Sequence, residues 1–390
     1  MGTWAAAMTG KGTGAIATIQ VLGDQAAQIV SHLFRPAGPS PADLIPGRIA
    51  LGAVVDGQQI LDQVVVGCED HDLFAIHCHG NPLILESIMA LVEAAGAQLV
   101  SPEVLLAKVY SAGGADAIQV EARLVQLTAR TLEGVRLIAN QVQTGLRQTV
   151  LQWRDLPPQA VQDQAREVLV NSVPGRLIIH GCTAVIAGPP NTGKSTLLNW
   201  LAGRDKAIVT SLGGTTRDCV RAECRVGPLC LDLIDTAGLS ANLTSEVDQA
   251  AQDKTLQAIE GADLVLLVLD GHQTVDQIRD LPLDRLAAKP VLTLLNKSDL
   301  ATRLNAADLP CPLIQTLRVS ARCHTDLGAL AQAICQACGV AGFALETPVV
   351  FTPRQRRLVE RLADGYSTSD PGATITQLLN GPIAEEGSPV

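Results

Sequence analysis

The chain has 390 residues, of which 47% are apolar and 17% charged, and a formal net charge of −10. This length allows two or three domains with buried cores. Its longest apolar run, around Leu264–Leu269, is far shorter than the roughly 20 residues that cross a bilayer, so we expect a cytoplasmic protein without a membrane segment. The acidic balance argues against a uniformly basic DNA- or RNA-binding surface, and an aromatic content of 2% leaves few side chains for stacking on bases.

The first 110 residues have the alternating strand and helix patterns of a small α/β domain. A β-type run at Ala15–Leu22 precedes a helical pattern at Asp24–Leu33, and Arg35–Pro46 is a loop with four prolines. Three further strands and a helix are then expected, at Ile49–Val55, Gln63–Val66, Leu73–Cys78 and Leu83–Ala95.

The pattern then becomes helical. Apolar residues recur at three- and four-residue intervals from Ala115 to Gln152, which predicts a long amphipathic helix, and the pattern continues over Gln159–Val170. After a further domain, residues 343–390 return to helix at Pro353–Ala363.

Residues 177–340 alternate strands and helices, which is typical of an open, mostly parallel sheet with helices on both faces. Only Gly227 and Pro228 separate the second strand from the third, and this predicts one antiparallel hairpin at the sheet edge. The six expected strands are Thr183–Ala187, Cys219–Val226, Leu229–Ile234, Leu264–Asp270, Val291–Leu295 and Ile314–Ser320.

A phosphate-binding loop is predicted directly after the first of these strands. The segment GPPNTGKS, from Gly188 to Ser195, matches G-x-x-x-x-G-K-[ST] and precedes a helix. In such a loop the backbone N–H groups face the phosphates at a helix N-terminus, Lys194 reaches the β- and γ-phosphates as a catalytic group, and the Ser195 hydroxyl ligates Mg²⁺. The nucleotide-binding residues expected here are Gly188, Asn191, Thr192, Gly193, Lys194, Ser195 and Thr196.

Three further motifs stand at the ends of strands. The first, DTAG, places the Asp235 carboxylate beside Mg²⁺ and the Gly238 N–H at the γ-phosphate. The second, NKSD, lies at the carboxyl edge where open α/β sheets bind ligands, and Asp299 can accept from N1–H and the 2-amino group of guanine. The third, Ser320-Ala321, can donate a backbone N–H to guanine O6. Together they predict GTP as the ligand, bound additionally by Asp235, Gly238, Asn296, Lys297, Asp299, Ser320 and Ala321.

The segment Gly214–Asp218 lies between the phosphate-loop helix and the hairpin. A switch threonine at this place would reach both Mg²⁺ and the γ-phosphate, and we assign this catalytic and metal-binding role to Thr216. The alternative is a polar turn at the entrance of a strand. The predicted Mg²⁺ ligands are thus Ser195, Thr216 and Asp235.

With GPPNTGKS, SLGGTTRD, DTAGL and NKSD in this order, the chain resembles the MnmE (TrmE) family of tRNA-modification GTPases. Thr3–Thr9, Gly12–Leu22 and Ile76–Pro82 extend the resemblance over nearly the whole length. It implies hydrolysis of GTP to GDP and phosphate by an α/β P-loop GTPase domain, inserted in a helical domain and preceded by a small α/β folate-binding domain. The expected boundaries are 1–110 for the N-terminal domain, 111–176 and 343–390 for the helical domain and tail, and 177–342 for the GTPase domain.

The resemblance also implies a K⁺ ion and a water-orienting acid. Asn191 occupies the position where the family holds K⁺ with an asparagine side chain, although it could instead satisfy a loop amide. The ion would neutralise charge between the β- and γ-phosphates in place of an arginine finger. The family's glutamate after DTAG corresponds to Asp248, which is one methylene shorter, so Asp248 or Glu246 is expected to orient the water. The residues assigned to K⁺ are Asn191, Thr210, Leu212 and Thr215, and Thr215 is also assigned to the nucleotide.

The family's partners are a second copy of the chain, tRNA and a flavin-dependent protein, and its N-terminal domain takes a tetrahydrofolate derivative. Cys68–Asp72 and Ser101–Val104 depart from the family's pattern, which weakens the case for folate. The printed chain ends at Glu386–Val390 without the family's Cys-Ile-Gly-Lys sequence. Two hypotheses stay open: an enzyme of tRNA wobble-uridine modification, and a GTP-dependent molecular switch that has lost this chemistry.

Three weaker signals have ordinary structural interpretations. Neighbouring strand residues in His77–His79 point to opposite faces, so we expect no metal site there. Cys335 and Cys338 lie on an amphipathic helix and are expected to face the core. The arginines of Arg354–Arg361 could touch RNA phosphates or simply form a solvated helix face.

Overall fold

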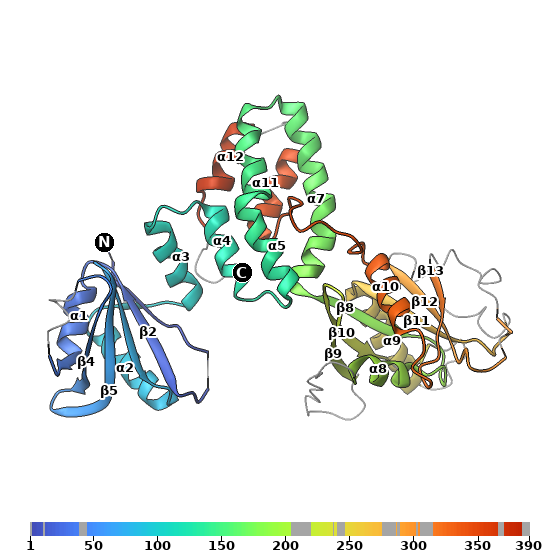
Figure 1. The fold of residues 1–390 in the computed structure, drawn as a ribbon, viewed down its shortest axis with the longest axis horizontal. Helices are drawn as coiled ribbons and strands as arrows, with labels where there is room; N and C mark the ends of the chain where they lie inside the picture. Colours follow the sequence, from blue (N-terminus) through green and yellow to red (C-terminus); the bar gives the residue numbers. More distant parts are fainter. Residues whose placement is uncertain are drawn as a thin grey trace. The chain divides into compact units, whose positions relative to one another are not determined.

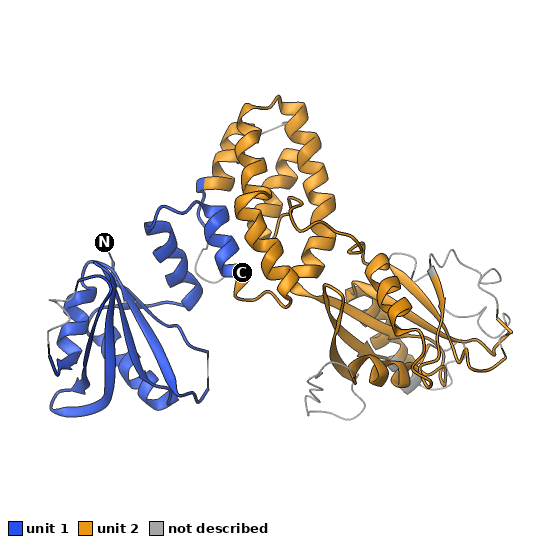
Figure 2. Ribbon diagram, viewed as in Figure 1, with its two compact units in different colours: residues 1–124, 380–390 blue, residues 125–379 orange. Residues whose placement is uncertain are grey.

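The computed structural model describes residues 2–10, 12–38, 45–203, 220–236, 238–239, 246–274, 286, 289–301, 303–304, 315–365 and 370–383. These residues form two compact units, which Figure 2 shows in different colours. One unit comprises residues 1–124 with 380–390, and the other residues 125–379. Within the described ranges, no helix is both long enough and apolar enough to cross a membrane.

The first unit is built on a seven-stranded sheet with the order β3-β4-β5-β6-β2-β1-β7. Alternate residues of β2, β5 and β6 are buried against helices α1 and α2 in one apolar core, which is the pairing that an amphipathic sheet requires. The expected strands and helices are confirmed, and β5 is longer than expected because it pairs with β4 from Gln59 to Cys68. Arg35 and Pro36, which were expected in a loop, instead pair with β4 as part of strand β3. The elements are β1 (Trp4–Ala7), β2 (Ile16–Leu22), α1 (Ala26–Leu33), β3 (Phe34–Pro36), β4 (Arg48–Asp56), β5 (Gln59–Asp70), β6 (Leu73–His79), α2 (Pro82–Ala94), β7 (Gln98–Leu99), α3 (Pro102–Ala112) and α4 (Ala117–Gln126).

The expectation of one long helix from Ala115 to Gln152 is wrong, because three helices occupy this stretch. After α4 the chain turns, and the Thr131 side chain caps a new helix by accepting from the Gly134 N–H at 2.9 Å. Gly145 starts the next helix at a place where a Cβ would lie 2.6 Å from the Gln141 amide oxygen. These helices are α5 (Leu132–Gln143) and α6 (Leu146–Gln152), followed by α7 (Pro158–His180).

The helical part is completed by residues from the other side of the inserted domain. Helix α11 (Pro353–Ala363) packs against α7, as Figure 1 shows for the orange-red and green segments. The Gln141 side chain joins α5 to the segment before α11, since its amide donates to the Thr347 carbonyl and accepts from the Val349 N–H. The α/β domain is therefore inserted in the helical domain as expected. A last helix, α12 (Pro371–Asn380), follows.

The inserted domain has a six-stranded sheet with the order β13-β12-β11-β8-β10-β9. All neighbours are parallel except β9 and β10, so the predicted edge hairpin is confirmed. Parallel strands end at one edge of a sheet, and this edge gathers the motifs. The elements are β8 (Cys182–Ala187), α8 (Lys194–Ala202), β9 (Arg221–Val226), β10 (Leu229–Asp235), α9 (Glu246–Gly261), β11 (Leu264–Asp270), β12 (Val291–Asn296), β13 (Gln315–Arg318) and α10 (Leu327–Ala337).

The two cysteines of the C-x-x-C sequence face the core, as expected. Both Cys335 and Cys338 are buried, and the sulfur of Cys338 lies 3.8 Å from that of Cys182 at the start of β8. Burial raises the pKa of the Cys335 thiol, which keeps it protonated and unreactive.

Candidate nucleotide-binding site

The loop between β8 and α8 has a backbone that only glycine permits at two places. Gly188 has φ +143°, and a Cβ there would overlap the carbonyl oxygen of Val268. Gly193 has φ +95°, and a Cβ there would overlap the side-chain amide of Asn296. Asn191 also takes a left-handed conformation, with φ +62°, which asparagine tolerates better than most residues. The spacing of the motif therefore reflects local backbone geometry.

Lys194 folds back into this loop. Its Nζ donates to the carbonyl oxygens of Gly188, at 3.1 Å, and Pro189, at 2.9 Å. Burial lowers the pKa of Lys194 from its ordinary value, while the nearby Asp235 carboxylate opposes this shift. A charged ammonium that has lost water gains from an anion placed beside it, so a phosphate in this loop would stabilise the charged form of Lys194. The Thr192 hydroxyl closes the same turn by donating to the Pro189 carbonyl at 3.0 Å.

Ser195 and Asp235 come together as the motifs predict. The Ser195 hydroxyl donates to Asp235 Oδ2 at 2.6 Å. The second oxygen, Oδ1, is buried and has no hydrogen-bond partner among the described residues. Hydroxyl and carboxylate oxygens are the ligands that Mg²⁺ prefers. The DTAG turn also lies against the phosphate loop, since a Cβ on Gly238 would lie 2.8 Å from the Pro190 nitrogen.

Asp299 and Asn296 of the NKSD motif are both held by hydrogen bonds to other loops. Asp299 accepts from the Ser320 hydroxyl at 2.6 Å, and this hydrogen bond lowers the pKa of Asp299 and keeps its carboxylate ionised. Asn296 is buried and joins two loops, because its amide donates to the Thr192 carbonyl at 2.8 Å and accepts from the Ala321 N–H at 3.0 Å.

Lys297 of the NKSD motif has a partner that the sequence analysis did not predict. Lys297 has φ +64° and its Nζ lies 2.6 Å from Asp270 Oδ2. Sequence reasoning missed Asp270, which is the last residue of β11 and pairs in register with Asn296. A carboxylate ending a buried strand next to the NKSD strand was the signal that could have found it.

Several predicted site residues are not placed. Thr210, Leu212, Thr215 and Thr216 lie outside the described residues, as do the side chains of Glu246 and Asp248 in the first turn of α9. The side chain of Asn191 is exposed, as is that of Thr196 in the first turn of α8.

Known proteins resemble the chain in both its N-terminal and its nucleotide-binding parts. Residues 183–297 match the family model of the 50S ribosome-binding GTPase, and residues 3–103 match that of the GTP-binding protein TrmE N-terminus. The tRNA modification GTPase MnmE of Desulfotalea psychrophila is 32% identical over 379 residues, which cover 85% of this chain and 80% of that protein. The chain belongs to the MnmE (TrmE) family. The MnmE of Geobacter sulfurreducens, also 32% identical, matches 82% of this chain and 77% of its own length.

Membership of the MnmE family makes the chain a GTP-binding enzyme that hydrolyses GTP, as expected from the order of its motifs. The predicted fold class is also confirmed, with a TrmE-type N-terminal domain before the GTPase domain. Among solved structures, the G domain of the T. maritima FeoB iron transporter is 27% identical to this chain and has a TM-score of 0.34. The match covers 40% of this chain and 99% of the FeoB chain.

Proposed function

We propose that this MnmE-family chain uses GTP hydrolysis in the modification of the wobble uridine of tRNA, as a homodimer and with a flavin-dependent partner protein. The observation that carries this proposal is the extent of the similarity. It reaches 85% of the chain and includes the N-terminal domain as well as the GTPase domain, and the relatives concerned are named tRNA modification GTPases. The proposed compartment is the cytoplasm, where tRNA is available.

The nucleotide site supports specific roles for its residues. Lys194 would bind the β- and γ-phosphates, and the ionised Asp299 would accept hydrogen bonds from the guanine edge. Asn296 would hold the phosphate loop and the Ser320–Ala321 turn in register. A Mg²⁺ ion fits this site, because the unpartnered buried oxygen of Asp235 lies beside the Ser195 hydroxyl. Ser195, Asp235 and Thr216 would hold the ion, which neutralises charge on the phosphates when bound.

A K⁺ site and an acid that orients the attacking water are proposed from the sequence. The exposed Asn191 side chain, on a loop held in a left-handed turn, is free to contribute its amide oxygen to a cation. Thr210, Leu212 and Thr215 would supply the other ligands, and Asp248 or Glu246 would orient the attacking water. The domain boundaries 1–110, 111–176, 177–342 and 343–390 are likewise proposed as the functional parts.

A folate ligand is left out of this proposal. The N-terminal unit has a pocket of about 210 Å³ beside its glycine-rich segment, lined by Gly10, Gly12, Gly14, Gly80 and Asn81 among others. Ligand pockets typically enclose roughly 300–1,000 Å³, so this pocket is small for a tetrahydrofolate derivative.

Complementation tests the proposed function. A bacterial strain that lacks its own MnmE is given the full chain or its Lys194→Ala variant, and wobble uridines are measured by mass spectrometry. Restored modification by the wild type alone is expected. Unmodified uridines in a strain whose extract shows GTP turnover by the chain would contradict the proposal and favour a molecular switch.

A further inference from the structure

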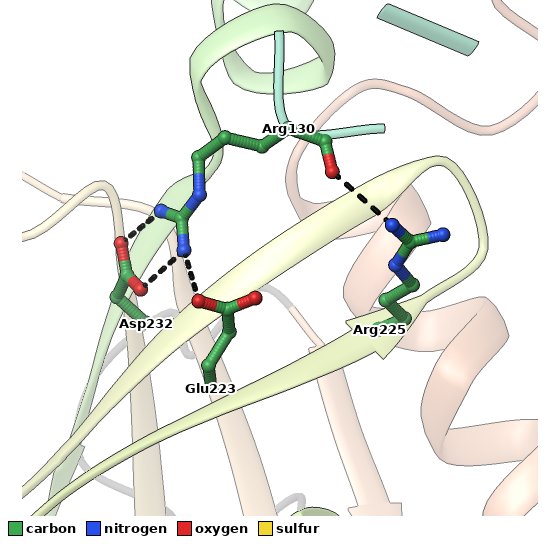
Figure 3. Close-up of polar contacts among 4 residues, drawn as sticks. All are labelled: Arg130, Glu223, Arg225 and Asp232. Carbon is green, nitrogen blue, oxygen red and sulfur yellow. Dashed lines mark hydrogen bonds and ion pairs between the residues drawn. The ribbon is translucent and has the colours of Figure 1, made fainter. Parts of the chain in front are cut away.

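Arg130, in the connection between α4 and α5, reaches from the helical part to the GTPase domain. Its guanidinium makes a two-pronged contact with Asp232, at 2.5 and 2.8 Å, and a third hydrogen bond of 2.7 Å to Glu223. Figure 3 shows both carboxylates around the guanidinium, and Arg225 donating to the Arg130 carbonyl oxygen. One side chain of the helical part therefore binds both strands of the β9–β10 hairpin.

The hairpin ends at the candidate nucleotide site, because Asp235 is the last residue of β10. Glu223 and Asp232 are opposite each other in the register of β9 and β10, so Arg130 fixes a cross-strand pair. Asp232 precedes Asp235 by three residues on β10, and the Asp235 carboxylate accepts from the Ser195 hydroxyl of the phosphate loop. GTP differs from GDP at the γ-phosphate, which acts on the turn that follows Asp235. A shift of this turn that is passed along β10 would carry Asp232 with it, because both ends belong to one strand.

The other end of the contact is fixed in the helical part. The Arg130 N–H donates to the Ile179 carbonyl at 3.0 Å. The next residue, Thr131, caps α5 and donates its hydroxyl to the Ile178 carbonyl at 3.0 Å. A Cβ on Gly181, with φ +92°, would lie 2.8 Å from Arg130 Nη1. Arg130 is thus held against the N-terminus of α5 and the C-terminus of α7.

We propose that Arg130 is a positioning residue that couples the β9–β10 hairpin to α5, so that the helical part responds to whether GTP or GDP is bound. The proposal rests on the GTPase activity and not on the proposed RNA substrate. A planar guanidinium that makes two parallel hydrogen bonds to a carboxylate fixes the orientation of the carboxylate as well as its distance. A lysine ammonium fixes only the distance. Asp232 and Glu223 also raise the pKa of Arg130 above its ordinary value, with the hydrogen bond to Asp232 as the main cause, so the charge is permanent.

The ion pairs of Arg130 contribute little to the stability of the fold, which leaves coupling of the hairpin to α5 as their role. The side chains of Arg130, Asp232 and Glu223 are 27%, 44% and 53% exposed, and ion pairs at this exposure contribute little to the free energy of unfolding. A second ion pair between the same two parts joins Arg176 on α7 to Asp263, just before β11. This pair does not touch the hairpin and serves as a matched control.

Hydrogen exchange on the full chain tests the coupling. The peptide covering α5 is compared in Mg²⁺ with GDP and with a non-hydrolysable GTP analogue. The wild type is expected to exchange differently in the two states, and Arg130→Gln is expected to abolish this difference. Arg176→Gln should preserve it, and Arg130→Lys should retain part of it. A purely structural role would instead raise exchange equally in both nucleotide states.

The proposal is overturned if the exchange of the α5 peptide in the wild type does not differ between the two nucleotide states, or if this difference is unchanged in Arg130→Gln. Loss of the difference in Arg176→Gln, or loss of GTP binding in Arg130→Gln, also overturns it. Should Arg130→Gln fail to fold, Glu223→Gln removes one arm from the exposed side and keeps the pair with Asp232. A reduced difference in that variant supports the coupling, and an unchanged one refutes it.

Discussion

The Asn296 side chain donates to the carbonyl of Thr192, 104 residues earlier in the chain, at 2.8 Å. The same amide accepts from the Ala321 N–H, so one buried side chain joins the phosphate loop to the turn expected to recognise guanine. We therefore expect binding of the phosphates to be linked to binding of the base.

The first prediction concerns this link. Asn296→Ala leaves a buried carbonyl and a buried N–H without partners, and we expect a loss of about 2–4 kcal/mol in the free energy of unfolding, together with weaker GTP binding. Urea denaturation and nucleotide titration measure the two effects. Asn199→Ala, on the exposed face of α8, is the control and should stay within about 0.5 kcal/mol of the wild type. Equal stability of both variants would contradict the linking role.

A second prediction compares two glycines. Gly193→Ala forces a left-handed backbone on alanine and pushes a methyl group into the Asn296 amide, so GTP affinity should fall at least about tenfold, which corresponds to about 1.4 kcal/mol. A Cβ on Gly328, in the first turn of α10, meets open space. Gly328→Ala should therefore stabilise the fold by about 0.5–1 kcal/mol and leave GTP binding unchanged.

Guanine specificity is the third prediction. Asp299→Asn reverses one hydrogen-bond partner at the base, so preference should move from GTP to xanthosine triphosphate. The loss for GTP is expected to be about 1–3 kcal/mol. Competition binding with GTP, ATP and xanthosine triphosphate measures it. Equal affinity of the wild type for ATP and GTP would refute the role of Asp299.

The fourth prediction is that K⁺ accelerates hydrolysis and favours association of two GTPase domains. Turnover is measured in KCl and NaCl at equal ionic strength, with the oligomeric state followed by light scattering. Asn191→Ala should remove the difference between the two salts. Identical wild-type rates in both salts, together with a silent Asn191→Ala, would exclude the ion.

Lys194 gives the fifth prediction, which concerns pH. Its pKa is lower in the folded chain than in the unfolded chain. At a pH between these two pKa values, the unfolded chain holds a proton that the folded chain has lost. Stability without nucleotide therefore rises with pH in this alkaline window. Urea midpoints of the wild type should increase relative to those of Lys194→Met as the pH rises toward the ordinary lysine pKa of about 10.4. A constant difference between the two proteins would contradict the effect of burial.

The sequence by itself determined the parts of the site whose chemistry is local. Gly188, Gly193 and Lys194 belong to one loop of eight residues whose backbone needs glycine at two places. Asp235 is the last residue of β10, and Asp299 follows shortly after β12 ends at Asn296. Because parallel strands end at the same edge of a sheet, strand order in the sequence was enough to bring Ser195 to Asp235.

Tertiary structure alone decided the contacts between distant segments. Apolar periodicity did not distinguish one long helix over Ala115–Gln152 from three. The break before α5 is held by hydrogen bonds from the Arg130 N–H and the Thr131 hydroxyl to carbonyls of α7, which is distant in the sequence. The contact of Arg130 with Asp232 likewise has no signature in the sequence, and the pair Lys297–Asp270 can be predicted only once β11 and β12 are known to be neighbours. An ion pair depends on where two surfaces meet after packing, and packing is a property of the whole chain rather than of any short pattern within it.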